Sequence, residues 1–322
     1  MRYKKFFALL LALALLCGSL SGCAAGQTAA PAEPAVSFTD SLGRTVNIPE
    51  TLTRVAPSGA VASMFLATIA PEYMTTINAT PSSSQYKYLD PRLIDLPTTG
   101  QMYGSKSTLN LESILTSGVQ VVIDLGDKKD NMAADLDALQ RQIGMPVIFI
   151  EADLPHMAEA YRTLGKILSG KEARGEELAA FVEETVSMAE ENAAVVEDVS
   201  NKGGGNPINL EQLYRFDPDV ILFAAGSIYQ TAAGDEAWQP LRAIQTGRYY
   251  EVPSMPYNWL SGPPSLNMLL GVWWLGNLLY PQYYDYDMVE KTQEMFRLFW
   301  AYDLSADEAR AMLANSTLKD AS

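Results

Sequence analysis

The chain has 322 residues, 48% of them hydrophobic, with 38 acidic against 23 basic residues and a formal net charge of −15 at pH 7. A protein that binds nucleic acid through phosphate contacts needs a basic stripe, so this charge balance argues against such a role. Only two cysteines occur, both within the first 23 residues, which excludes a disulfide framework for the rest of the chain.

The first 22 residues are predicted to be a lipoprotein signal peptide. Three basic residues precede the apolar run 6–16, which is too short to span a bilayer. The sequence LSGC at 20–23 resembles a bacterial lipobox. That resemblance implies cleavage before Cys23 and acylation of Cys23, which would anchor the protein on the extracytoplasmic face of the cell membrane. The alternative is an ordinary secretory signal with an incidental cysteine.

Residues 23–37 are predicted to be the lipidated cysteine and a flexible tether. The segment is rich in Ala, Pro and Gln, and Glu33 is its one charged residue. Without the signal peptide the chain keeps 20 basic and 38 acidic residues, a net charge of −18. An anionic membrane surface would repel such a protein, so the lipid has to hold it there.

Residues 38–170 are predicted to form an N-terminal α/β lobe. Strands are expected at 54–56, 74–78, 119–123 and 147–150. Helices are expected after the first strand up to Ile69, at 130–143 and at 157–166. Strand, helix and strand in this order indicate a parallel sheet.

Residues 171–194 are predicted to be a connecting helix, because apolar side chains recur at helical spacing from 173 to 194. The earlier pattern then resumes over 195–322, the predicted C-terminal α/β lobe. Its strands are expected at 220–224 and 248–252, and its helices at 236–246, at 263–280 and after a capping box at Ser305. The predicted fold class is therefore α/β, with two Rossmann-like lobes and parallel sheets joined by a single long α-helix.

A repeat supports the two lobes. Residues 110–124 read NLESILTSGVQVVID and residues 209–223 read NLEQLYRFDPDVILF, and they align without a gap. Each copy is interpreted as a helix start with an exposed glutamate that leads into a central strand. Chance similarity between two common helix-to-strand units is the alternative.

Motifs for catalysis or metal binding are absent from the sequence. His156 is the only histidine, and neither HExxH nor GxSxG occurs. The stretch 165–171 nearly matches a phosphate loop, but position 172 is Glu where Ser or Thr would hold magnesium, so a helix end at Gly170 is expected instead. We therefore predict no catalytic residues, no metal ligands and no cofactor, and a binding protein rather than an enzyme.

Several segments together resemble one protein family. FTDSLGRTVNIP at 38–49, followed by Arg54-Val55-Ala56, resembles the N-terminal signature of class III substrate-binding proteins of ABC importers. The two NLE segments, the long helix and the run from Trp238 to Tyr250 resemble the same family, so the likeness extends from 38 to about 300.

The resemblance implies a monomer that captures an iron chelate of the siderophore type and delivers it to an ABC permease with its ATPase. Haem or cobalamin is the alternative solute within the family. It also implies one docking glutamate on each lobe, here Glu112 and Glu211, facing basic residues of the permease. Stabilisation of a helix N-terminus is the alternative role for both glutamates.

The chain departs from the family's pattern in its second half. Only 17 positions separate Asn192 from Asn209, where the family places a strand and a helix. The C-terminal lobe is therefore predicted to be shortened by one strand-helix unit, which would expose sheet edges.

Ligand-binding residues are expected at the carboxyl ends of strands, where parallel α/β lobes bind their ligands. Aromatic side chains with polar tips in such positions suit a large chelate. The candidates are Ser58, Tyr103, Lys106, Tyr229, Tyr257, Asn258 and Trp259. Packing is the alternative for Tyr257 and Trp259, and plain solvation is the alternative for Lys106.

Two other functional classes stay open from the sequence. The protein could be a surface lipoprotein that senses a ligand and contacts a signalling partner. It could also be a hydrolase with a site that no known motif reveals.

Overall fold

The computed structural model describes residues 34–103, 108–193 and 209–318. The predicted signal peptide, Cys23, the tether up to residue 33 and Lys106 lie outside the described residues. Within the described ranges, no helix has both the length and the apolar character needed to cross a membrane.

The described chain begins with a hairpin of β1 (Ala35–Thr39) and β2 (Thr45–Pro49), which pair antiparallel. The resembled signature segment therefore lies in this hairpin, and its Val46 and Ile48 are buried in the main core. Its turn is attached to the first sheet, because Ser41 donates a backbone hydrogen bond to the Phe149 carbonyl oxygen at 3.0 Å.

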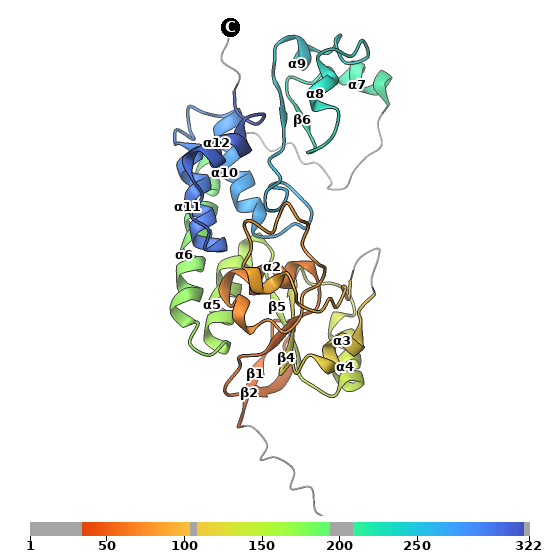
Figure 1. The fold of residues 1–322 in the computed structure, drawn as a ribbon, viewed down its shortest axis with the longest axis vertical. Helices are drawn as coiled ribbons and strands as arrows, with labels where there is room; N and C mark the ends of the chain where they lie inside the picture. Colours follow the sequence, from red (N-terminus) through yellow and green to blue (C-terminus); the bar gives the residue numbers. More distant parts are fainter. Residues whose placement is uncertain (1–33, 104–107, 194–208, 319–322) are drawn as a thin grey trace, which may run out of the picture. The chain divides into compact units, whose positions relative to one another are not determined.

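The first parallel sheet contains three strands in the order β3 (Val55–Pro57), β4 (Val121–Gly126) and β5 (Val147–Glu151). Nearly all their residues are buried, as expected for apolar strands covered on both faces. The helices of this region, visible in Figure 1, are α2 (Ala60–Ile69), α3 (Leu111–Thr116), α4 (Met132–Ile143) and α5 (Met157–Ile167). Short 3₁₀ helices lie at Pro71–Tyr73, Pro91–Leu93 and Leu154–His156.

The predicted strand at 74–78 is wrong. Met74 makes an isolated bridge to Val55, and Ile77 makes another to Thr98. The segment thus changes its pairing partner within three residues, so no continuous ladder forms along either neighbour.

The long helix predicted at 173–194 is found as α6 (Glu172–Ala193). It packs on α5, and the two backbones approach closely at Gly175, where an added Cβ would lie 2.6 Å from the Tyr161 carbonyl oxygen. Gly170 lies between the two helices with φ +73°, a conformation that favours glycine. The stretch 165–171 therefore contains the helix end that was predicted at Gly170, and its Gly165 also packs closely against Gly175.

A second parallel sheet contains β6 (Ile221–Phe223) and β7 (Tyr249–Glu251). Among the described residues this sheet has two strands and the first sheet has three. The shortening of the C-terminal lobe by one strand-helix unit stays a prediction. Its helices are α7 (Leu210–Phe216), α8 (Tyr229–Ala232) and α9 (Arg242–Gln245). The helix predicted at 236–246 is thus much shorter than expected, because Pro240 lacks an N–H donor and disfavours helical backbone at Gln239.

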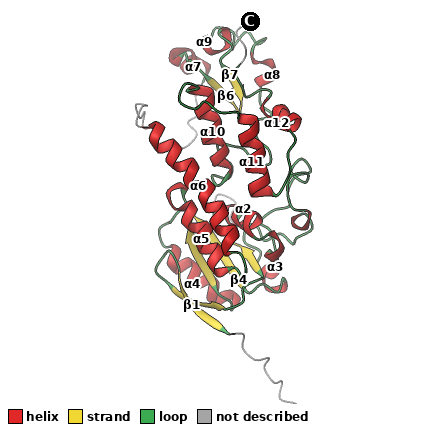
Figure 2. Cartoon of the chain, turned by 90° about the vertical axis from the view of Figure 1, so that its left-hand side faces the viewer, coloured by secondary structure: helices red, strands yellow, loops and turns green. Residues whose placement is uncertain are grey.

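Three further helices complete the fold: α10 (Asn267–Leu279), α11 (Met288–Trp300) and α12 (Ala306–Leu313). Helix α10 starts later than the predicted Pro263, and α11 was not predicted. Ser305 forms the predicted capping box with Glu308 at the start of α12. Figure 2 shows α10 and α11 near α6, and one cluster of buried side chains runs from the first sheet through α6 to these helices.

Candidate functional site

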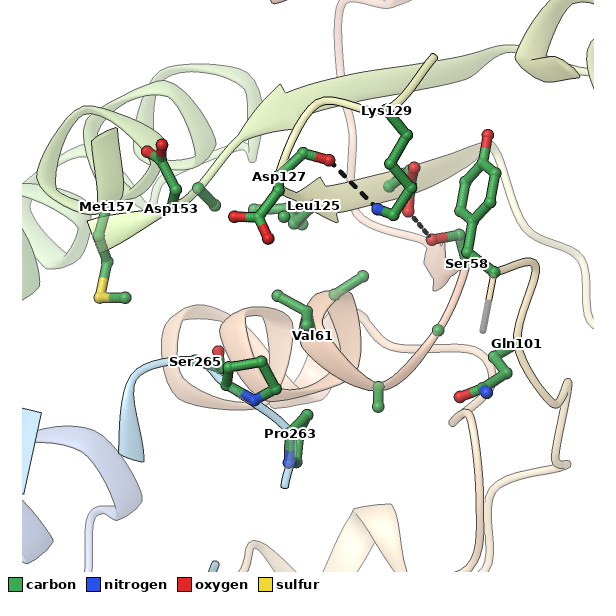
Figure 3. Close-up of a pocket in the computed structure, with 18 of the residues that line it drawn as sticks. Ser58, Val61, Gln101, Leu125, Asp127, Lys129, Asp153, Met157, Pro263 and Ser265 are labelled. Atoms are coloured by element: carbon green, nitrogen blue, oxygen red, sulfur yellow. Dashed lines mark hydrogen bonds between the residues drawn. The ribbon is translucent and has the colours of Figure 1, made fainter. Parts of the chain in front are cut away.

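A cavity of about 530 Å³ lies beyond the carboxyl ends of β3, β4 and β5. Ser58 follows β3, Asp127 follows β4 and Asp153 follows β5, and all three line the cavity. The first turns of α2 and the segment 263–265 before α10 complete the wall, as Figure 3 shows. This is the position where open parallel sheets bind ligands, and the volume falls in the usual range for small-molecule sites.

Asp124 is the most deeply buried charged residue in the cavity wall, with 4% of its surface exposed. It sits near the end of β4, and its Oδ1 accepts a hydrogen bond from the Ser58 hydroxyl. Its other oxygen, Oδ2, is buried and has no partner in the described residues. Burial raises the pKa of Asp124 to about 6, while the hydrogen bond from Ser58 opposes that rise.

Tyr103 and Lys129 lie beside this carboxylate. The Tyr103 hydroxyl is buried without a partner among the described residues, and burial, then the nearby charge of Asp124, raises the pKa of Tyr103 above its usual range. The Lys129 ammonium lies 4.9 Å from the centre of the Tyr103 ring and donates to the Asp127 carbonyl oxygen at 3.2 Å. Lys129 is thus held by a cation–π contact and a backbone acceptor.

Ser265, which also lines the cavity, contains a third polar atom without a partner in the described residues. Ser265 is 3% exposed, and its Oγ has no hydrogen-bond partner within the described part of the chain. Figure 3 places Ser265 and Pro263 across the first turn of α2 from Lys129 and Ser58. Buried polar atoms without partners are rare and costly in folded proteins. Asp124, Tyr103 and Ser265, which each have one such atom, all belong to the residues that line this cavity.

Two of the predicted ligand-binding residues, Ser58 and Tyr103, line this cavity, whereas Lys106 lies outside the described residues. Tyr229 is instead buried in a small cluster with Phe223 beside the second sheet. The role of each in binding stays a prediction.

Tyr257, Asn258 and Trp259 do not line the cavity in the described structure. The Trp259 side chain is fully enclosed, and its indole N–H donates to the Met255 carbonyl oxygen at 3.0 Å. The Tyr257 ring lies 5.6 Å from that of Trp300, and Asn258 Oδ1 accepts from the backbone N–H of Leu260 at 2.9 Å. These contacts are those of packing and a turn, the alternative that the sequence left open for the two aromatic residues.

Sequence reasoning missed Asp124, although a signal was present. The apolar run Val121-Val122-Ile123 ends in a carboxylate at the carboxyl end of a predicted parallel strand. A carboxylate in such a place is exposed, paired within the protein or available to a ligand, because an unpaired buried carboxylate is costly.

A second group of polar residues surrounds His156. Its Nδ1 contacts Asp153 Oδ1, and its Nε2 lies 3.9 Å from Glu151 Oε2. Candidate ligand atoms of the three residues lie within 4.8 Å of one another. Lys128 Nζ, however, already pairs with the same Glu151 oxygen at 2.6 Å. The group is explained as a partly exposed ion-pair network, and the expectation of no metal ligand stays a prediction.

The two glutamates predicted to dock the permease lie in the first turns of α3 and α7, and both are exposed. Asn110 caps α3 through its side chain, which accepts from Ser113 N at 3.1 Å. Asn209 caps α7 in the same way, accepting from Gln212 N at 2.9 Å. The repeated segment is thus confirmed as a capped helix start that leads into a strand, while docking by Glu112 and Glu211 is untested.

Comparison with known proteins gives the class of fold. No protein-family model and no curated protein matches the sequence. Among solved structures, an ABC transporter solute-binding protein from Sulfurospirillum deleyianum has a TM-score of 0.76 and 24% identity, covering 86% of this chain and 99% of that one. A periplasmic solute-binding protein from Veillonella parvula has a TM-score of 0.71 and 19% identity, with 88% and 98% covered.

A third solved structure shares the fold. The molybdate-binding protein MolA of Haemophilus influenzae, bound to molybdate, has a TM-score of 0.62 and 17% identity, covering 84% of this chain and 99% of that one. The chain therefore has the fold of solute-binding proteins of ABC transporters, the fold that the sequence resemblance implied.

Proposed function

We propose that this protein is an extracytoplasmic solute-binding protein that holds a small molecule in the cavity beside Asp124 and delivers it to the permease of an ABC importer. One observation carries the proposal. In a fold shared with solute-binding proteins, a cavity of about 530 Å³ lies at the carboxyl ends of the parallel strands and is lined by polar residues that include Ser58, Tyr103 and Asp124. Open parallel sheets bind their ligands at this position.

Within this function, an iron chelate of the siderophore type is the proposed solute, with haem or cobalamin as the alternative. The support comes from the N-terminal signature and the two NLE segments, which resemble importers of metal complexes. A chelate also presents an organic shell whose polar groups could meet Ser58 and Tyr103, while its apolar parts meet Val61 and Met268.

The protein is further proposed to be a monomer anchored to the membrane by lipid on Cys23. The apolar run before Cys23 and the LSGC sequence support this anchor. Anchoring would keep the protein close to the permease, which raises the effective concentration of the loaded form there.

The decisive experiment is native mass spectrometry of protein purified from its own source, followed by equilibrium binding of the molecule it carries. We expect one bound solute that dissociates intact on denaturation. Deletion of the gene should then abolish uptake of that solute. A bound molecule that is chemically converted on incubation would indicate a hydrolase instead, and normal uptake after deletion would favour a sensing lipoprotein.

A further inference from the structure

We infer that the permease binds this protein through two equivalent apolar anchors, Leu115 on α3 and Tyr214 on α7, each three positions after an exposed glutamate. The partner that fits presents to each helix an apolar surface with a basic residue beside it. This inference rests on the proposed function, because the partner is the permease of the proposed importer.

Exposed apolar side chains are concentrated on these two helices, which Figure 1 labels. Nine large apolar side chains are exposed among the described residues, and four of them belong to α3 and α7, although these helices have only six and seven residues. The four are Leu115, Leu210, Tyr214 and Phe216. Single exposed apolar residues are normal, whereas a concentration of them marks an interaction surface.

Leu115 and Tyr214 occupy the same position in the repeated segment. Each lies five residues after the asparagine that caps its helix. Each also lies three positions after a glutamate of the first turn, Glu112 in α3 and Glu211 in α7. Residues three apart are neighbours on a helix surface. Both helices thus present an acidic and an apolar side chain together on one exposed face.

Packing within the lobes does not account for these two residues. The preceding residue faces inward in each helix, since Ile114 is fully buried and Leu213 packs against the small cluster around Phe223. Leu115 and Tyr214 belong to neither cluster, and 52% and 41% of their surfaces are exposed. The predicted shortening of the C-terminal lobe would not explain the pattern, because Leu115 lies in the N-terminal lobe and is the more exposed of the two.

The Tyr214 ring is held in place before any partner binds. Its hydroxyl donates to the Ala237 carbonyl oxygen at 2.6 Å, while part of the ring stays exposed. Tyrosine supplies a large and rigid contact area at a low cost in conformational entropy, and it is enriched in interfaces for that reason. Leu210 lies one turn earlier on the same face and is also exposed, so it enlarges the apolar surface.

The charges beside the anchors define the chemistry of the partner. Glu211 lies 3.5 Å from Arg215, and both side chains are largely exposed. Such a pair contributes little and can be exchanged for a cation of the partner. In an interface the apolar centre holds the partners together, while charges at the rim steer and orient them. A second copy of this chain is a poor occupant, because two chains of net charge −15 repel each other.

The first test identifies the partner in cells of the source organism. The photoreactive amino acid p-benzoylphenylalanine is placed at Leu115 or at Tyr214 in the full chain, and mass spectrometry identifies the cross-linked protein. Tyr283 and Leu318, which are 49% and 50% exposed outside α3 and α7, are the matched control positions. We expect cross-links to a membrane-embedded permease from both anchors and from neither control. Cross-links to a second copy of this chain, to another class of protein or to none would overturn the inference.

The second test measures affinity for that permease with its ATPase, reconstituted in nanodiscs and fixed to a sensor. Glutamine is the replacement, because it is polar and has a helix propensity close to that of leucine. Leu115→Gln and Tyr214→Gln should each weaken docking at least about fivefold, and the double variant at least about twentyfold. Leu318→Gln and Tyr283→Gln should stay within about twofold of the wild type. Unchanged affinity in the double variant would overturn the inference.

Salt and a conservative variant separate the anchors from other effects. At about 0.5 M salt the contribution of exposed charges is screened, whereas the losses in Leu115→Gln and Tyr214→Gln should persist. Tyr214→Phe keeps the ring without the hydrogen bond to Ala237 and should bind within about threefold of the wild type. Losses that vanish at high salt, or a loss in Tyr214→Phe equal to that in Tyr214→Gln, would overturn the role of these side chains as apolar anchors.

Failure of the anchors is distinguishable from failure of the proposed function. Deletion of the gene that abolishes uptake of the co-purified solute, together with anchors that cross-link to no permease, would remove the anchors and keep the importer. Unchanged uptake after deletion, with no cross-link to a permease, would remove both.

Discussion

The indole N–H of Trp273 donates to the hydroxyl oxygen of Thr185 at 2.9 Å inside the core. The hydroxyl in turn donates to the Phe181 carbonyl oxygen at 2.9 Å. Because Trp273 lies on α10 and Thr185 on α6, the bond ties the long helix to the terminal helices. Both residues are almost fully buried, so water cannot replace either partner.

Replacing Thr185 by Val should therefore destabilise the protein although the side chain keeps its shape. The Trp273 N–H would be left buried without an acceptor, which costs roughly 1–3 kcal/mol. Urea unfolding followed by circular dichroism measures the loss. Thr185→Ser, which keeps the hydroxyl, should lose clearly less than Thr185→Val. Equal losses in the two variants would assign the effect to the missing methyl group and not to the hydrogen bond.

Much of the fold could be predicted because its signals are local. The apolar runs at 119–123 and 147–150 became β4 and β5, and the NLE segments became capped helix starts. Strand pairing is not local in this way. Residues 74–78 have a strand-like sequence, but they make only two isolated β-bridges, from Met74 to Val55 and from Ile77 to Thr98. No strand forms, because neither bridge is extended into a ladder.

The candidate site was harder to predict than the fold, because its residues come from segments that are far apart in the sequence. Asp124 accepts a hydrogen bond from Ser58, which lies 66 positions earlier in the chain, and the same cavity is lined by a distant segment that includes Ser265. Aromatic composition drew attention to Tyr257 and Trp259, although composition alone does not say whether a ring faces a cavity or a core. The strand-end rule led to Ser58, which does line the cavity, because that rule describes topology; binding by Ser58 stays a prediction.

Arg44 should be one of the most sensitive positions in the hairpin. Its guanidinium pairs with the buried carboxylate of Asp40 at 2.7 Å and donates to the Val147 carbonyl oxygen at 2.6 Å. Arg44→Met would leave Asp40 buried without its cation, so the free energy of unfolding should fall by about 3–5 kcal/mol. Chemical denaturation measures this change. Arg297→Met, at an exposed pair with Asp303, is the control and should cost little.

The resembled signature at 38–49 thereby has a structural reason, since Asp40 and Arg44 lie in it and fasten the hairpin to β5. A loss below about 1 kcal/mol for Arg44→Met would contradict this explanation. It would mean that the two hydrogen bonds of the Phe149 backbone, one from Ser41 N and one to Asp40 Oδ2, suffice to hold the hairpin.

Trp259 should prove a packing residue. Its side chain is fully enclosed, and its carbonyl oxygen approaches α10 so closely that a Cβ on Gly271 would lie 2.1 Å away. Trp259→Ala should lower the free energy of unfolding by about 3–5 kcal/mol through the cavity it leaves. Calorimetric titration of the identified solute, well below the melting temperature, should show affinity within about threefold of the wild type. A tenfold loss of affinity with unchanged stability would instead restore the stacking role that the sequence suggested.

Cys23→Ser should release the protein from the membrane. The lipid on Cys23 is the proposed attachment, and within the described ranges no helix can span a bilayer. Fractionation of cells and incorporation of labelled palmitate measure the two parts of this expectation. The variant should appear in the soluble fraction without label, whereas Cys17→Ser, inside the cleaved segment, should behave as the wild type. Absence of label from the wild-type protein would refute the lipobox interpretation.

Glu112 and Glu211 give the last prediction, which concerns transport and not binding. Both are exposed at helix starts, and neither lines the cavity. Glu112→Lys and Glu211→Lys should therefore leave solute affinity unchanged. Each should slow uptake, because the new charge would repel the basic residue expected on the permease, and the double variant should be slower than either single variant.

Uptake of radiolabelled solute into vesicles, measured beside equilibrium binding by the free protein, separates the two effects. Glu112→Gln and Glu211→Gln serve as controls, since they remove the charge without reversing it and should give intermediate rates. Because Glu211 also lies 3.5 Å from Arg215 on its own helix, unfolding should be measured for each variant. Partial rescue by a permease that carries Glu at the facing position would demonstrate direct pairing. Full uptake by the double lysine variant would leave stabilisation of the two helix N-termini as the reason for both NLE segments.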